Sequence, residues 1–252
     1  MKQTFQSITA GNINIVMNEL EVGEILSLAK LNPRLKEHQL SGFLRHALDD
    51  DTAPYTMTCQ QRYFCLLHYL SAQKENDLAV DVNINDYLHL DAKPWKEQVT
   101  VGDISVRQLN GCEIEALEVI AEDIGDWMLG AMALQISYGD QLPYIQPLTD
   151  QVLASKIIKS RFLAIQKLSQ DELNQLYEKY AEAQDELNVL LTIGFDSEGV
   201  TLYEAKGGLD SEPARFQIDS TFTGFTKRLF STLVEGSKQT SAELGDEFNG
   251  GF

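Results

Sequence analysis

The segment GCEIEALEVIAEDIGDWMLGAMALQISYG, residues 111–139, decides how this chain folds. Its first half places acids on one side and Ile114 and Leu117 on the other. Its second half, from Trp127 to Ile136, is apolar almost all round. An apolar pattern of this kind is typical of a helix that is buried on every side. We therefore expect a central pair of helices against which the other segments pack.

The composition is that of an acidic globular protein. The chain has 252 residues, 43% of them hydrophobic, which is enough for a substantial core. Its formal net charge is −18, because 38 acids face 20 bases. Such a surface repels nucleic acid phosphates and anionic membranes, and it favours basic protein partners.

The cysteine count and the lengths of the apolar runs indicate in which cellular compartment the protein is found. Three cysteines without close pairing argue against a disulfide framework and favour a reducing environment. The first residues lack the apolar core of a signal peptide, and no run of about 18 apolar residues occurs. We expect a protein of the cytosol, or of a particle assembled there, without a membrane span.

Local patterns predict most of the elements. Thr58 with Gln61, and Ser169 with Glu172, have the spacing of capping boxes, so we expect helices to begin at both places. We expect the helix over 149–168 to pair antiparallel with the helix that begins at Ser169. The remaining expected elements are strands at 11–18, 99–106 (a short hairpin or a strand bent at Gly102-Asp103), 189–203 (a hairpin) and 214–218, and helices at 22–31, 35–48 and 222–233.

These elements predict an α+β fold, mainly helical, with a small antiparallel β-hairpin region in the C-terminal half. Pro143 and Pro147 end the central apolar block, so we place the domain boundary there. The predicted units are a mainly helical domain at 1–147, a helical pair with hairpin and final helix at 148–235, and a flexible tail at 236–252.

Three acids of the central segment have metal-site spacing. Glu115, Glu118 and Glu122 recur at i, i+3 and i+7 and so share one helix face. Di-metal sites in helical bundles add a histidine three residues after a glutamate, and this segment contains no histidine. We therefore interpret the three acids as a solvated face.

A second acidic stretch resembles part of a calcium loop. Asp81, Asn83 and Asn85 match the first ligand positions of an EF-hand. The required glycine and the bidentate acid are replaced by Asp86 and Ala92. An Asx turn is the better interpretation.

The cysteines and histidines give no strong catalytic pattern. Cys59 and Cys65 are too far apart along one helix for a zinc site with His68. No nucleophile elbow, phosphate-binding loop or dinucleotide fingerprint occurs. We therefore expect a non-enzymatic protein with no cofactor and no metal. An enzyme whose site combines His46, His68, Asp51 and Cys59 stays an open alternative.

Several short motifs are similar to those of bacteriophage tail proteins. They are LEVGEIL at 20–26, NPRL at 32–35, MTCQQRY at 57–63, VGD at 101–103 and ISYGD at 136–140. Together they resemble the helical core with Gly-Asp turns of T4-type baseplate hub and tail-assembly proteins. Members of that family often carry a cysteine-pair zinc element, which this sequence lacks.

The resemblance implies a structural or assembly protein of a phage tail or baseplate. Its partners would be other tail or baseplate proteins in a multimeric assembly, without direct nucleic acid contact. It would lie in the host cytoplasm during assembly and in the virion tail afterwards. The aromatic residues that we expect to contact partners lie in the hairpin, the last helix and the tail: Phe195, Tyr203, Phe222, Phe225, Phe230, Phe248 and Phe252.

A second alternative is an acidic inhibitor or nucleic-acid mimic. It would present carboxylates to a protein that binds nucleic acid. Ordered acidic rows on one face of the fold would favour it, and in the sequence the acids are spread out.

Overall fold

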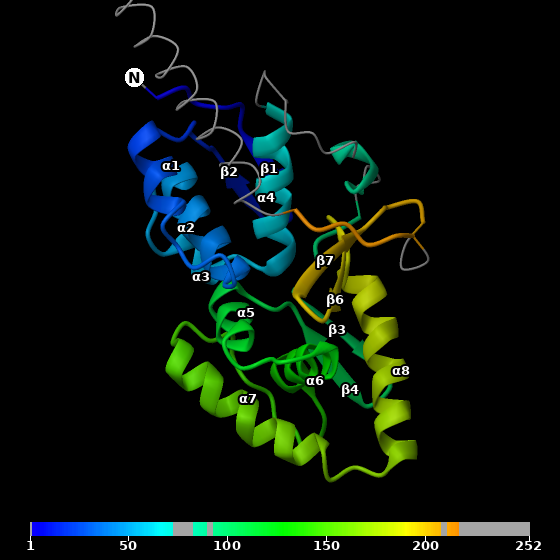
Figure 1. Ribbon diagram of the computed structural model, residues 1–252. Helices are drawn as coiled ribbons and strands as arrows, with labels where there is room; N and C mark the ends of the chain where they lie inside the picture. The colour runs from blue at the N-terminus through cyan, green and yellow to red at the C-terminus, as the bar shows by residue number, and fades with distance from the viewer. Residues whose placement is uncertain (1, 73–82, 90–92, 208–210, 217–252) are drawn as a thin grey trace, which may run out of the picture.

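The computed structural model describes residues 2–72, 83–89, 93–207 and 211–216. In this part of the chain the fold is α+β, with eight α-helices and three small antiparallel sheets, which confirms the predicted fold class (Figure 1). Among the helices described, none is both long enough and apolar enough to span a bilayer.

The N-terminal region is a helical layer that begins with a short hairpin. Strands β1 and β2 pair antiparallel, with Ile8 opposite Ile15. The predicted capping box at the start of α4 is confirmed, since the Thr58 N–H donates to Gln61 Oε1 at 2.9 Å. The elements are β1 (Ile8–Ala10), β2 (Ile13–Ile15), α1 (Val22–Leu28), α2 (Lys36–Leu48), α3 (Ala53–Thr56) and α4 (Cys59–Ala72).

The middle region contains the central helices and a three-stranded sheet of order β3-β4-β5. Of the two structures expected for 99–106, the short hairpin is the one that forms: β3 and β4 pair antiparallel, and Gly102 in their turn has a φ of +59°. The elements are a 3₁₀ turn η1 (Ile84–Asp86), β3 (Gln98–Val101), β4 (Ile104–Arg107), α5 (Gly111–Glu118), α6 (Ile124–Gln135) and β5 (Ile136–Ser137).

The C-terminal region consists of two long helices and the predicted hairpin. The Ser169–Glu172 capping box is present at the start of α8. Gly199 has a φ of +116° in the hairpin turn, a conformation that glycine adopts without strain. The elements are α7 (Gln151–Ile165), α8 (Gln170–Leu187), β6 (Thr192–Asp196) and β7 (Gly199–Tyr203).

Helices α5 and α6 occupy the centre, as the sequence predicts. Every residue from Gly130 to Gln135 is buried. Helix α7 packs against α5 and α6, while β4 and β6 also contact α6. The 111–139 segment is therefore shared by the sheet, the hairpin and the last helices.

Two buried clusters form the core, and both cross the predicted domain boundary at 147/148. The larger joins the N-terminal helices to Ala154, Leu191 and Leu202. The smaller joins Val99 of β3 to Tyr180 of α8. Segments on either side of the boundary therefore share apolar packing.

The predicted antiparallel pairing of the two long helices is wrong. Helix α7 lies against α5 and α6, and α8 lies against β3 and β4 on the other side of α6 (Figure 1). The reason is that each helix buries a separate stripe. Ala154 and Ile158 of α7 face the central helices, while Leu176 and Tyr180 of α8 face the sheet.

Candidate binding site between α8 and the β6–β7 hairpin

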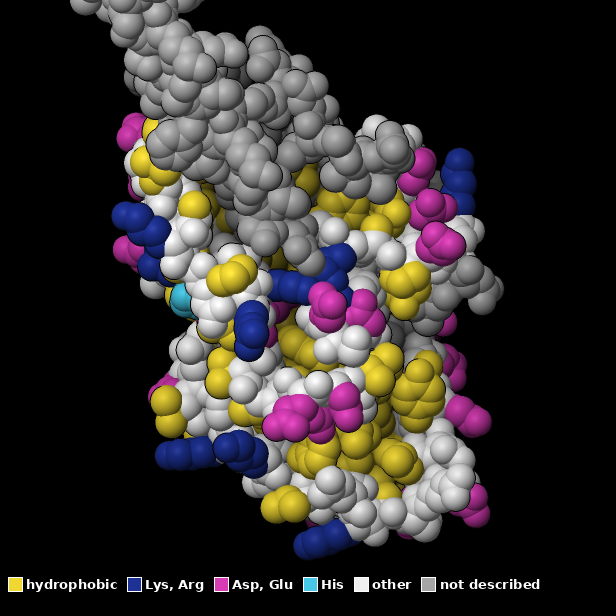
Figure 2. All heavy atoms as spheres, viewed as in Figure 1, with side chains coloured by type: hydrophobic (Ala, Val, Ile, Leu, Met, Phe, Trp, Pro, Cys, Tyr) yellow, Lys and Arg dark blue, Asp and Glu magenta, His cyan; other side chains and the backbone are white. Residues whose placement is uncertain are grey.

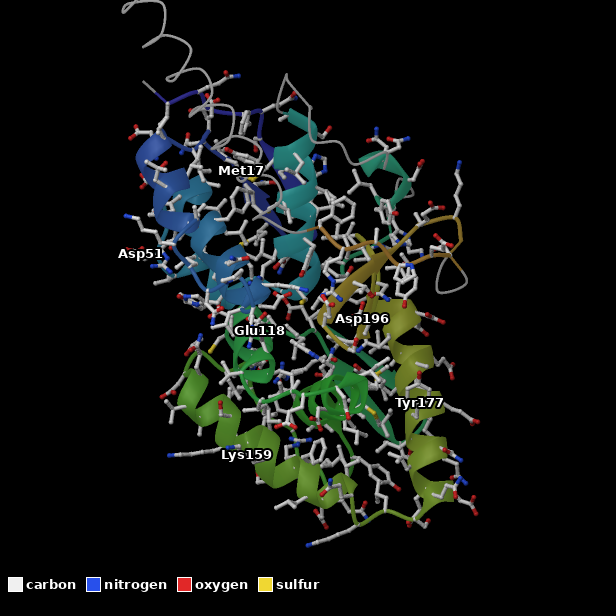
Figure 3. All side chains as sticks on the ribbon, viewed as in Figure 1. Met17, Asp51, Glu118, Lys159, Tyr177 and Asp196 are labelled. Carbon is white, nitrogen blue, oxygen red and sulfur yellow. The ribbon has the colours of Figure 1, made fainter. Side chains whose placement is uncertain are left out.

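A pocket of about 250 Å³ lies between α8, the β6–β7 hairpin and the start of α4. Figure 3 marks Tyr177 on α8 and Asp196 at the end of β6, the two elements that flank it. Four aromatic rings line its walls, those of Tyr177, Tyr180, Phe195 and Tyr203. We call this space the α8–hairpin pocket.

The hairpin wall is held in place by packing on the central helix. Phe195 stacks on Trp127 of α6, with ring centroids 6.0 Å apart and an interplanar angle of 16°. The Tyr203 ring lies so close to Gly194 that an added Cβ would stand 2.5 Å from it. Gly194 therefore lets the aromatic ring lie flat against the strand backbone.

The inner end of the pocket is fixed by Gln60 of α4. Its Oε1 accepts hydrogen bonds from the backbone N–H groups of Val189 and Leu190, both at 3.0 Å. Its Nε2 donates to the Leu187 carbonyl at 2.7 Å and to Gln108 Oε1 at 3.1 Å. One buried amide thus holds the end of α8 and the start of the hairpin against α4.

A second glutamine, Gln135 of α6, joins the middle of α8 to strand β4 through its side-chain amide. Gln135 Oε1 accepts hydrogen bonds from the Tyr180 hydroxyl at 2.7 Å and from Gln184 Nε2 at 3.1 Å. Its Nε2 donates to the Arg107 carbonyl at 2.7 Å. Burial raises the pKa of the Tyr180 hydroxyl, which therefore stays neutral and donates. The pocket is preformed by these bonds.

One polar side chain of the pocket has its hydrogen-bonding capacity free. Asn188 is 6% exposed and lines the pocket, and no residue in the described ranges bonds its side-chain amide. Its amide atoms are not among the fully buried polar atoms that lack a partner, so they keep contact with solvent and can donate to, or accept from, a group that enters the pocket.

The interpretation of the central acids as a solvated face is wrong for two of the three. Glu115 is only 3% exposed. It accepts hydrogen bonds from Ser41 Oγ and from Gln151 Nε2, the latter at 2.7 Å, and it lies 3.3 Å from His38 Nδ1. Among the residues that the structure describes, no three His, Cys, Asp or Glu side chains group as a metal site requires.

Glu118 caps a different helix from its own. Helix α2 has Leu35 at its N-cap and no side-chain cap from within. The Glu118 carboxylate of α5 accepts hydrogen bonds from the backbone N–H groups of Glu37 at 2.9 Å and His38 at 3.2 Å (Figure 3). Burial, with the nearby Glu37, raises the pKa of Glu118 to about 7. The third acid, Glu122, is exposed after the end of α5, as expected for a solvated residue.

Two further acids are buried in ion pairs. Arg107 forms two hydrogen bonds with Glu113, at 2.9 and 2.6 Å, and Glu113 is fully buried. Arg62 is fully buried too and lies 3.3 Å from Glu37. One pair joins β4 to α5 and the other joins α4 to α2, and both leave their charges almost no contact with solvent.

The residues of the alternative enzyme site are not brought together. The α8–hairpin pocket holds Cys59 but not His46, His68 or Asp51. His46 lies 3.3 Å from Ser27 Oγ, and His68 packs on Phe64. Burial raises the pKa of the Cys59 thiol, which opposes formation of a thiolate nucleophile.

The Asx-turn interpretation is confirmed where the structure describes it. Asn83 Oδ1 accepts a hydrogen bond from the Asn85 N–H at 3.2 Å, and Asn83 Nδ2 donates to Asp86. Asp81 and Ala92 lie outside the described residues.

Two predicted contact residues, Phe195 and Tyr203, lie in the pocket. The other five lie outside the described residues: Phe222, Phe225, Phe230, Phe248 and Phe252. The α8 wall was not among the predicted contacts, although its residues do recur at helical spacing in the sequence: Tyr177, Ala181, Gln184 and Asn188.

No protein-family model, curated protein or solved structure matches this chain.

Proposed function

We propose that this chain is a non-enzymatic structural or assembly protein of a bacteriophage tail or baseplate. It acts through protein–protein contacts, and the α8–hairpin pocket holds a segment of a neighbouring protein. Assembly takes place in the host cytoplasm, and the product is the virion tail.

The observation that carries the proposal is the chemistry of the pocket. Tyr177, Phe195 and Tyr203 offer aromatic surface, and the Asn188 amide offers hydrogen bonds. Aromatic side chains around a preformed pocket are typical of the places where an anchor residue of a partner binds. A volume of about 250 Å³ suits one large side chain of a peptide.

The hairpin adds a way to bind the backbone of such a segment. Strand β6 lies at the edge of its sheet, because β7 pairs with it on one side. An extended peptide can add to an edge strand through main-chain hydrogen bonds, while pockets accept its side chains. Ile193, Gly194 and Phe195 of β6 line the pocket, so one segment can use both.

The tail or baseplate setting is supported by the sequence motifs that resemble phage proteins. LEVGEIL at 20–26 spans the start of α1, and MTCQQRY at 57–63 spans the start of α4. The second motif contains Gln60, whose amide holds the inner end of the pocket.

Peptide selection tests the pocket directly. A library of random peptides is selected on the full chain, and the binding of the selected peptides is measured for the variants Tyr177→Ala and Ala181→Phe. We expect peptides with an aromatic or large aliphatic anchor, and a loss of at least tenfold in affinity in both variants. The first variant removes a wall, and the second fills the space.

The matched control is Tyr144→Ala. Tyr144 is 49% exposed and Tyr177 is 44% exposed, but Tyr144 lies outside this pocket. Equal losses in the control, or selected peptides that ignore both pocket variants, would contradict the proposal. The tail setting is tested separately, by mass spectrometry of the proteins that co-purify with the tagged chain in its source cells.

One observation favours the second alternative, the acidic inhibitor or nucleic-acid mimic. Asp171, Glu178, Glu182 and Asp185 are exposed and lie opposite the buried stripe of α8, in a row along its outer side. A protein that binds nucleic acid could dock on this row. If Glu178→Gln with Glu182→Gln released such a partner and Tyr177→Ala did not, this alternative would replace the first.

A further inference from the structure

The exposed side of helix α7 carries lysines and apolar residues, although the chain as a whole is acidic. Val152, Lys156, Lys159, Leu163 and Lys167 are all exposed, and their spacing places them opposite the stripe that α7 buries. We call these five residues the α7 outer face. Figure 3 shows Lys159 extending away from the helix.

The charge of this face is opposite to that of the whole chain. No acid occurs from Gln151 to Gln170, although the chain carries 38 acids and a net charge of −18. Within the described part of the chain, no carboxylate forms an ion pair with Lys156, Lys159 or Lys167. The face is therefore a local positive region on an acidic chain, and its three lysines make no ion pair with a carboxylate of the described residues.

An apolar groove lies beside the lysines. It measures about 360 Å³ and is lined by six apolar residues and two charged ones: Leu117, Ile120, Ala121, Ile158, Phe162 and Leu163, with Asp126 and Lys159. Clustered apolar exposure next to a charged rim is typical of an interaction site.

Among the described residues, exposed apolar side chains are frequent on the elements that line this groove. Ten large hydrophobic side chains are exposed in the described residues, and five of them belong to α7 or to the stretch from the end of α5 to the first residue of α6: Val119, Ile124, Val152, Leu153 and Leu163. In Figure 2 dark-blue lysine and arginine side chains follow the lower left edge, where α7 runs.

We propose that the α7 outer face and its groove bind the C-terminal segment of this same chain, residues 243–252. The segment reads ELGDEFNGGF. Glu243, Asp246 and Glu247 would pair with the lysines, and Phe248 would enter the groove, with Leu244 or Phe252 beside it. The segment lies outside the described residues, so the proposal rests on the face and on the composition of the segment.

Charge complementarity selects this occupant. The segment has three acids and no base over ten residues, and α7 has bases and no acid. The other aromatic segment near the C-terminus, 222–233, carries Lys227 and Arg228 and no acid, so the lysines of α7 would repel it.

The intervening chain is long enough to reach. The described residues end at Phe216, which packs on Tyr87, so residues 217–242 connect it to the segment. At about 3.5 Å for each extended residue, this connection spans up to roughly 90 Å. A globular chain of this length has a radius of gyration of about 18 Å, so every part of its surface lies within range.

A labelled synthetic peptide of residues 240–252 tests the proposal on the full chain. The receptor carries Phe248→Ala and Phe252→Ala, so that its own tail competes less. We expect fluorescence anisotropy to show binding that is tighter than to the unmodified chain. We expect it to weaken at least tenfold when the receptor also carries Lys156→Glu and Lys159→Glu, and to weaken with added salt.

The matched control is a receptor with Lys30→Glu and Lys206→Glu. Both lysines are exposed and belong neither to α7 nor to the lining of the groove, and the change in net charge is the same. We expect this receptor to bind the peptide as the parent does. We also expect a peptide with Phe248→Ala to bind at least fivefold more weakly than the natural one.

Three results would overturn the proposal. The first is no binding of the peptide at millimolar concentration. The second is an equal loss in the Lys156/Lys159 receptor and in the Lys30/Lys206 receptor, which would show a net-charge effect only. The third is equal binding of the Phe248→Ala peptide, which would show that no anchor enters the groove.

Discussion

Helices α5 and α8 both carry acids at helical spacing, and the structure uses those acids in opposite ways. On α5, Glu113 and Glu115 are buried, and each is surrounded by donors from other elements. On α8, Glu178 and Glu182 are exposed and make no ion pair within the described part of the chain. Glutamates at helical spacing are therefore buried and hydrogen-bonded to other elements on α5, whereas on α8 they are exposed to solvent.

The difference teaches that acid spacing alone does not tell a solvated face from a buried polar layer. Helix α8 packs mainly on β3 and β4, and the side opposite its buried stripe stays in water. Helix α5 is surrounded by α2, α3, α6 and α7, so acids on every side of it meet another element. The number of neighbours of a helix decides the environment of its charges.

The largest expected effect follows from breaking the buried pair on α5. Arg107→Met leaves Glu113 fully buried and without its partner, so we expect a loss of about 3–5 kcal/mol in the free energy of unfolding, measured by urea denaturation. The double variant Arg107→Met with Glu113→Leu should recover most of this loss. If Arg107→Met alone lowered the free energy of unfolding by less than about 1 kcal/mol, the Arg107–Glu113 pair would have to be in contact with solvent.

A smaller loss is expected at Glu115. Glu115→Ala removes the acceptor of Ser41 and Gln151 and leaves their donors without it, so we expect a loss of about 2 kcal/mol. The same urea measurement on Ser41→Ala should give a smaller loss, because the other donors to Glu115 remain. If Glu115→Ala were as stable as the parent, the hydrogen bonds that the buried Glu115 accepts would not contribute to the stability of the fold.

Glu118, a further acid of α5, is expected to make the free energy of unfolding depend on pH. Its pKa of about 7 in the folded protein lies above the ordinary value of about 4.3, so the folded state holds the proton more tightly. This contribution is fully present below about pH 4 and is lost as the pH rises through 7. Between pH 5 and pH 8 we expect the unmodified chain to lose about 1–2 kcal/mol more stability than Glu118→Gln, since partial solvent screening reduces the full effect. Parallel pH profiles of the two proteins would disprove the assignment.

The smallest effect is expected on α8. Glu178→Gln and Glu182→Gln should each change the free energy of unfolding by no more than about 0.5 kcal/mol, because exposed acids without a partner contribute little. A slight stabilisation is expected, since each change reduces the net charge of −18. A loss above about 1 kcal/mol would show that the α8 acids also belong to an internal contact.

Features determined by nearby residues could be predicted from the sequence. The capping box at Thr58 and the turn at Gly199 depend on residues within a few positions, and both are confirmed. The apolar run from Trp127 to Ile136 needs burial wherever it lies, so its central place could be predicted too.

Features that join distant segments could not be predicted. Glu115 meets Ser41 from 74 positions away, and Gln60 meets Val189 from 129 positions away. Neither partner is marked by local spacing. The candidate site divides in the same way. The hairpin wall, with Phe195 and Tyr203, could be predicted from its strand pattern. The α8 wall could not, because Asn188 lines the pocket only where Gln60 of α4 holds the end of α8.

The cap that Glu118 provides has a consequence for synthesis on the ribosome. Helix α2 is translated first, and the carboxylate that binds the N–H groups of Glu37 and His38 is added 80 or 81 residues later. At about 5–20 residues per second, the ribosome needs roughly 4–16 s to cover that interval. During this time the nascent α2 lacks its cap, and the N-terminal layer cannot be completed until α5 has been translated.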